Sequence, residues 1–214
     1  MQFLNRIRKP EKKGKSKSVR ASILIFLLGI ALGIISKWLD GLGLDSAVWW
    51  QRAIEKMRLP QILSELPVWV FLALVFAVYS SSALKAAVNA FLLFAGSCAA
   101  YHIWSVVFSG FDPGSYMLIW YALTILSPFL AAVCWYAKGK GAVPVIIDTL
   151  IIAVMYNLCF AVGWIYVGFK GIFEALLFAA VIAVLYRDAA QAAISLAAGT
   201  VIGFLICRLP VFPK

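Results

Sequence analysis

The distribution of charge along the chain constrains the fold more than any other feature. Successive charged residues are separated by long uncharged stretches, which are 21–36, 66–84, 86–111, 113–137, 149–169, 175–186 and 189–207. A helix needs about 17–25 mainly apolar residues to cross a bilayer, and most of these stretches approach or exceed that length. With 64% hydrophobic and 13% charged residues, the chain also has too few charges to cover the surface of a soluble domain. The sequence therefore predicts an all-α, polytopic transmembrane helix bundle.

We expect seven spans in a single transmembrane domain that covers residues 21–214. Their predicted limits are 21–39, 66–82, 85–107, 116–137, 142–163, 171–186 and 189–207. The sixth stretch is short and has Glu174 near its start, so a bundle of six spans is the alternative. Pro128 in the fourth span predicts a kink, because proline removes a backbone hydrogen bond from a helix.

Residues 1–20 form a strongly basic segment. They contain eight Lys or Arg residues and one Glu, and so carry +7 of the net charge of +10. Such a segment buries too little apolar surface to fold alone, and we expect a disordered cytoplasmic tail that is drawn to anionic lipid head groups. The positive-inside rule then places the N-terminus and the short basic turns at Lys85, Lys140 and Arg187 on the cytoplasmic side. A basic arm can also bind nucleic acid, but no aromatic residues alternate with these charges, and no nucleic-acid partner is predicted.

The segment 45–58 has the pattern of an amphipathic helix. Asp45 is a suitable N-cap, apolar residues from Trp49 to Met57 share one face, and charged residues occupy the other. This pattern predicts a helix that lies in the membrane interface. It would serve either as a lid over a pocket in the bundle or as a surface anchor.

The chain contains a weak internal repeat. Residues 75–89 match residues 181–195 at an offset of 106, with identities that are mostly Val and Ala. Parallel repeats occur in transporters, where the binding site lies between the halves. Alanine-rich apolar sequences also produce such matches by chance, so both interpretations stay open.

Polar residues inside a membrane are costly, and each is a candidate site. Asp148 lies about 12 Å along the fifth span from Lys140 at 1.5 Å per residue, and it must be neutral, hydrated or paired across helices. It is a candidate proton or cation site, or a structural carboxylate. Asn89, with Ser195 as its counterpart in the repeat, is a candidate polar site or a hydrogen bond between helices.

A second group of polar residues is predicted near the outer face. His102 and Asn157 each follow a cytoplasmic lysine by 17 residues, so they are expected at a similar depth. With Glu174 they are candidates for the lining of an outward-facing pocket. Tyr101, Tyr156 and Asp112 belong to the same expected layer.

Other residues favour packing over chemistry. Gly29 and Gly33 form a small-xxx-small stripe, which permits close helix contact within the bundle or with a membrane partner or second copy. The four cysteines fall in predicted spans without a CxxC pair and are expected to act as small apolar residues. No metal site or cofactor is predicted. The sequence has no Walker loop, nucleophile elbow or HExxH motif, which argues against an enzyme.

Three segments resemble a family of small bacterial multi-pass integral membrane proteins of unknown function. They are Leu28–Asp40, Ser82–Asn89 and Trp135–Gly141. The resemblance implies a multi-helix bundle in a bacterial cytoplasmic membrane and transfers no catalytic residue.

The function expected from these features is the binding or transport of a small solute or ion, alone or as a permease subunit. The alternative is a non-catalytic scaffold, anchor or regulatory partner of another membrane complex.

Overall fold

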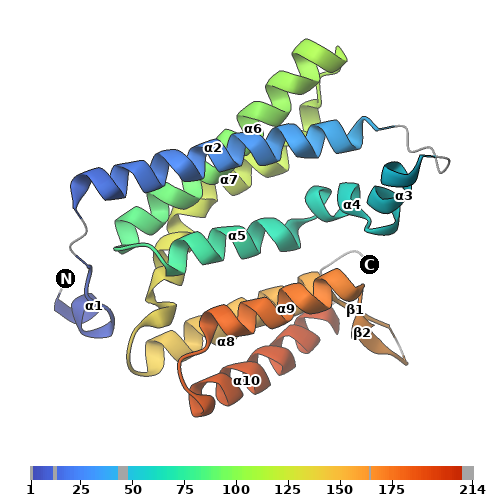
Figure 1. Cartoon of the computed structure of the whole chain (residues 1–214). Helices are drawn as coiled ribbons and strands as arrows, with labels where there is room; N and C mark the ends of the chain where they lie inside the picture. Colours follow the sequence, from blue (N-terminus) through green and yellow to red (C-terminus); the bar gives the residue numbers. More distant parts are fainter. Residues whose placement is uncertain (1, 12–13, 43–47, 164, 209–214) are drawn as a thin grey trace.

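The computed structural model describes residues 2–11, 14–42, 48–163 and 165–208. The described chain is almost entirely helical, and its long helices lie side by side and alternate in direction (Figure 1). The prediction of an all-α bundle is confirmed. The helices are α1 (Gln2–Ile7), α2 (Lys15–Asp40), α3 (Trp49–Lys56), α4 (Leu59–Ser64), α5 (Leu66–Val78), α6 (Ala83–Ser109), α7 (Gly114–Trp135), the 3-10 turn η1 (Tyr136–Lys138), α8 (Ala142–Cys159), α9 (Ile172–Leu185) and α10 (Ala189–Arg208).

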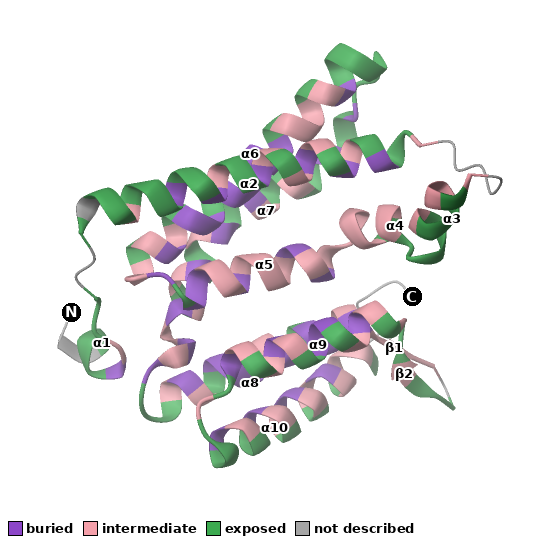
Figure 2. Ribbon diagram, viewed as in Figure 1, coloured by how far each residue is buried: buried purple, intermediate pink, exposed green. Residues whose placement is uncertain are grey.

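Five of the described helices, α2, α6, α7, α8 and α10, are long and apolar enough to cross a membrane. The other two apolar helices are shorter, since α5 has 13 residues and α9 has 14. The predicted second span was 66–82, but α5 ends at Val78 because the chain turns through a run of serines before α6. Apolar side chains such as Leu24 of α2 and Phe129 of α7 are exposed, as expected for surfaces in contact with lipid. Exposed positions occur along much of α2 (Figure 2).

The N-terminal segment differs from the predicted disordered tail. Its described residues include α1, and α2 begins at Lys15 instead of residue 21. Ile7 is buried, and its carbonyl accepts a hydrogen bond from the Lys140 backbone NH at 2.8 Å. The Arg8 guanidinium donates to the carbonyls of Val78 and Trp135. These contacts order the segment although its own apolar content is low.

The amphipathic segment also differs in detail from the predicted single helix over 45–58. Asp45 lies outside the described residues, and α3 starts at Trp49. The helix ends at Lys56 because Arg58 adopts a left-handed conformation with φ 53°. Pro60 then lies in the first turn of α4, where proline is well tolerated.

The predicted fifth span, 142–163, is interrupted by a small β-hairpin. α8 ends at Cys159, and the strands β1 (Phe160–Val162) and β2 (Val167–Phe169) pair in antiparallel fashion. Phe160 stacks on Tyr156 with ring centroids 4.2 Å apart. This stacking attaches the hairpin to the end of α8.

The order of helices occurs twice in the chain. α5 starts at Leu66 and α9 at Ile172, while α6 starts at Ala83 and α10 at Ala189, so both pairs are 106 positions apart. This is the offset at which the sequence matches itself. In each part an earlier helix, α2 or α8, packs against the last helix. We refer to α2, α5 and α6 as the first half, and to α8, α9 and α10 as the second half; α7 joins them (Figure 1).

Glycines bring α2 and α6 into close contact in the first half. A Cβ atom added to Gly29 would collide with the backbone carbonyl of Leu93, and one added to Gly33 would collide with that of Ser97. The two helix backbones therefore touch at both glycines.

In the second half, α8 and α10 form the equivalent close contact, but here the glycines lie on the last helix, α10. Gly199 and Gly203 of α10 are 106 positions after the two α6 contact residues, and Cβ atoms there would meet Ile152 and Tyr156 of α8. These two α8 residues each come 123 positions after the corresponding glycine of α2. The two halves therefore have the same order of helices, and the contacts between their first and last helices occur at equivalent positions. In this contact alignment, α8 follows α2 by 123 positions and α10 follows α6 by 106.

Candidate functional site

An apolar crevice lies between α5, α7 and α8, where the two halves meet. Its volume is about 290 Å³, which is close to the lower end of the range for small-molecule sites, about 300–1,000 Å³. Small side chains make room for it, because Ala73 and Ala77 of α5 lie opposite Ala131 and Cys134 of α7. The polar side chain in its lining is Ser127, whose hydroxyl donates to the Thr124 carbonyl at 2.9 Å. The crevice therefore offers a hydrocarbon surface to a ligand.

The rim of the crevice lies on the outer surface of the bundle. Leu130 and Val133 of α7 are 52% and 53% exposed, and Leu150 and Val154 of α8 are 54% and 49% exposed. These residues also line the crevice. On a membrane-spanning bundle, this surface faces lipid. The crevice is thus accessible sideways to a membrane-dissolved molecule.

A charged cluster lies just beyond the end of the crevice that is marked by Cys134 and Ile147. Asp148 is fully buried, and its Oδ2 accepts hydrogen bonds from Arg187 Nη2 at 3.2 Å and from Gln191 Nε2 at 2.6 Å. Arg187 also donates from Nη1 to the Gly139 carbonyl. Among the described residues, Asp148 Oδ1 and Arg187 Nε have no hydrogen-bond partner. Of the three options open from the sequence, the structure places Asp148 in an ion pair across helices.

The first half has no such ion pair at the corresponding position. The contact alignment pairs Asp148 with Ile25, which comes 123 positions earlier and is also buried. Arg187 corresponds to Ser81 at the offset of 106. The first half therefore forms the same helix contact with an isoleucine in place of the carboxylate, and the fold itself does not require the ion pair.

Asn89 lies in a separate hydrogen-bonded group of the first half. Its Oδ1 accepts from Ser22 Oγ at 2.7 Å, and its Nδ2 donates to Ser80 Oγ at 2.9 Å. The counterpart Ser195 donates to the Val145 carbonyl at 3.5 Å, and Val145 again comes 123 positions after Ser22. Asn89 and Ser195 occupy equivalent places in the two halves, and each bonds the first helix of its own half.

Arg8 covers the C-terminal ends of α5 and α7. Its guanidinium lies 4.4 Å from the centroid of the Trp135 ring and donates to the Val78 carbonyl at 3.0 Å. Burial lowers the pKa of Arg8, while the nearby Glu11 carboxylate raises it. Ala77 and Cys134, which precede Val78 and Trp135 in the chain, line the crevice, so Arg8 lies beside the end of the crevice near Cys134.

The predicted outer pocket is not assembled as expected. His102 Nδ1 is hydrogen-bonded to Tyr121 at 2.9 Å, and Asn157 donates to the Gly203 carbonyl at 3.2 Å. Glu174 is buried in the first turn of α9. No hydrogen bond or ion pair between described residues joins His102, Asn157 and Glu174, because they belong to different halves or to separate helix contacts.

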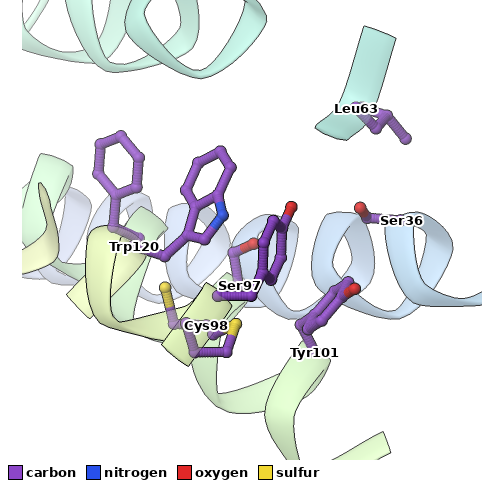
Figure 3. Close-up of a pocket in the computed structure, with 9 residues that line it drawn as sticks. Ser36, Leu63, Ser97, Cys98, Tyr101 and Trp120 are labelled. Atoms are coloured by element: carbon purple, nitrogen blue, oxygen red, sulfur yellow. The ribbon is translucent and has the colours of Figure 1, made fainter. Parts of the chain in front are cut away.

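A different, very small cavity occurs on that side of the first half. It lies next to Tyr101, Ser36 and Ser97 and has a volume of about 20 Å³, enough for about one water molecule (Figure 3). Tyr101 also donates to Asp40 at 2.8 Å, and Asp40 accepts from Ser64 at 3.1 Å. This group ties α2, α4 and α6 together and leaves no room for a larger solute.

Within the described part of the chain, no three His, Cys, Asp or Glu side chains converge as a metal site. Family models, curated proteins and solved structures give no match to the chain. The geometry of the crevice and of the charged cluster is therefore the basis for assigning a function.

Proposed function

We propose that the protein binds the hydrocarbon chain of a small membrane-dissolved molecule in the crevice between its two halves. The observation that carries this proposal is the apolar, laterally open cavity of about 290 Å³ between α5, α7 and α8. Its position agrees with the rule that duplicated membrane proteins bind their ligands at the interface of the repeats. Whether the bound molecule is also moved across the membrane depends on a second conformation.

The proposal includes a seven-pass topology in a bacterial cytoplasmic membrane with the N-terminus in the cytoplasm. α5 and α9 are short, but each lies among the longer helices and connects two of them (Figure 1). Local thinning of the bilayer and tilting of neighbouring helices accommodate short spans at a modest cost.

Reporter fusions test this topology. Fusions after Lys140 and after Lys214 should report opposite sides of the membrane, because three spans separate the two positions in the seven-pass arrangement. Reporters on the same side would show an even number of crossings between them and would exclude the seven-pass topology.

A crevice-filling variant tests ligand binding. In nanodiscs, Ala73→Phe should reduce cross-linking of a photoactivatable hexadecanol by about tenfold or more, because the phenyl ring occupies the space of the bound chain. Each buried methylene contributes about 0.8 kcal/mol, so the loss of a few methylene contacts is enough for a tenfold loss of affinity. Ala122→Phe is the matched control, since Ala122 is exposed on α7 and outside the crevice lining. Peptide mapping should place the wild-type cross-links on α5, α7 and α8. Equal labelling of both variants and wild type, or cross-links elsewhere, would refute the proposal.

A non-catalytic anchor or regulatory partner is the second candidate function. It is favoured by α3, which has no buried residue and leaves Trp49 79% exposed. Such an aromatic side chain suits either the membrane interface or the surface of another membrane protein. Absence of any chain binding in the crevice would leave this candidate in place.

A further inference from the structure

We infer that the crevice selects chains with an anionic polar end and that Lys138 binds this end at the cytoplasmic mouth. The inference rests on the proposed function, because it names the class of molecule whose chain would fill the crevice. The committed ligand is an anionic lipid of the inner leaflet. Its chain would lie between α5, α7 and α8, and its head group would lie beside η1.

The lining of the crevice gives the ligand a direction. From Ile147 to Val154 the crevice follows α8 for about 10 Å at 1.5 Å per residue, and no charged side chain lines it. At the Ile147 end the lining stops at Cys134 and Ile147, and the charged cluster around Asp148 lies just beyond them. The charged cluster gives a polar head group its partners at this end.

The charges at this mouth favour an anion. The Glu11 carboxylate interacts with Arg8, and Lys138 lies close enough to interact electrostatically with Arg8, Arg187 and the carboxylate of Asp148. The ion pair with Arg187 offsets that carboxylate. Three positive charges therefore face two carboxylates, which leaves one positive charge in excess next to an apolar cavity, where a negative head group gains most from it.

Lys138 has free hydrogen-bonding capacity. It follows Cys134, which lines the crevice, by one helical turn, and its ammonium donates to the Tyr186 carbonyl at 2.7 Å. An ammonium has three donors, and the structure shows one hydrogen bond for it among the described residues. Arg8 and Arg187 are each held by two hydrogen bonds, and the Arg187 Nε that lacks a partner is buried, so the head-group contact is assigned to Lys138.

Competition between amphiphiles tests the inference with the full chain in nanodiscs of zwitterionic lipid. Hexadecyl phosphate should displace the bound photoactivatable hexadecanol at a concentration about tenfold lower than unlabelled hexadecanol does, because one charge-assisted hydrogen bond contributes about that factor. Hexadecyltrimethylammonium should compete more weakly than hexadecanol. Raising the salt from about 0.05 M to about 0.5 M should shrink the advantage of the phosphate.

Variants assign the head-group contact. Lys138→Gln should remove most of the phosphate advantage and leave hexadecanol binding unchanged, whereas Lys138→Arg should retain the advantage. Lys140→Gln is the matched control, because Lys140 is exposed in the same turn. Thermal unfolding of each variant checks that the fold is intact, and Lys138→Arg keeps the test valid if Lys138→Gln does not fold.

The outcomes separate the two proposals. Equal competition by the phosphate and the alcohol would overturn the anionic selectivity and leave chain binding in place. An advantage that survives Lys138→Gln would overturn the role of Lys138. Absence of competition by every amphiphile would overturn the proposed function itself.

Discussion

The Asp148→Ala variant should lose about 3 kcal/mol of unfolding free energy, because it leaves the partly buried Arg187 guanidinium without its counter-charge. Asp148 is fully buried, and the Arg187 side chain is 17% exposed. Removal of the carboxylate also leaves the Gln191 amide without its 2.6 Å acceptor. Thermal or denaturant unfolding in detergent, followed by circular dichroism, measures the loss.

Replacing both partners should restore most of this stability. Asp148→Ile with Arg187→Ser imports the residues that the first half has at the corresponding positions, Ile25 and Ser81, and we expect unfolding within about 1 kcal/mol of wild type. Glu55→Ala, which removes an exposed carboxylate of α3, is the control and should have no effect. A double variant less stable than Asp148→Ala would show that the two halves do not correspond at this position.

The Gly29→Ala/Gly33→Ala double variant should be destabilised by about 1–3 kcal/mol at each site. A Cβ at either position collides with a backbone carbonyl of α6, which no side-chain rotation can relieve. Alanine is the better helix former by about 1 kcal/mol per site, so intrinsic helix propensity predicts the opposite sign. The sign of the change in unfolding free energy therefore shows whether helix packing or helix propensity dominates at these two glycines.

Ala31→Leu is the matched control for added bulk on the same helix. Ala31 is exposed on α2 and is expected to face lipid, so its enlargement should leave the unfolding transition unchanged. An increase in stability of the glycine double variant would mean that α2 and α6 do not touch at these residues in solution.

The all-α character and the approximate positions of the long helices could be predicted from the sequence, because uncharged apolar stretches mark them. Of the seven predicted spans, five correspond to described helices that are long and apolar enough to cross a membrane. The errors fall where side-chain contacts override composition. Arg8 binds carbonyls 70 and 127 positions away, so the order of the N-terminal segment depends on residues that local composition does not include. The end of α8 at Cys159 depends on the stacking of Tyr156 on Phe160 and on a hairpin that hydrophobicity alone does not reveal.

The candidate site was harder to predict, because its components lie far apart in the chain. Asp148 stands out as a carboxylate in an apolar stretch, but its partner Arg187 is 39 positions away and belongs to a turn. The crevice is lined by ordinary apolar residues, so no sequence motif marks it. A usable signal was the four-residue spacing of Ala73 and Ala77, whose small side chains leave the space that a ligand can occupy.

The internal repeat provides a comparison between the two halves that single residues do not provide. A match of alanines and valines at an offset of 106 is weak by itself, but the equivalent positions of Asn89 and Ser195 in their helix contacts give it a geometric meaning. Once the halves are aligned, the first half is a natural reference for the second. Features present in only one of them, such as the Asp148 ion pair, can then be distinguished from features that the shared fold needs.

The docking of the N-terminal segment also has a consequence for biosynthesis. The Arg8 guanidinium binds the carbonyl of Trp135, and the Ile7 carbonyl binds the backbone NH of Lys140, so neither contact can form before that turn has been synthesised. At about 5–20 residues per second, the ribosome needs roughly 6–26 s to extend the chain over that interval. During this time the basic segment is free to contact the membrane surface, and its final placement marks the moment when both α7 and the start of the second half are in position.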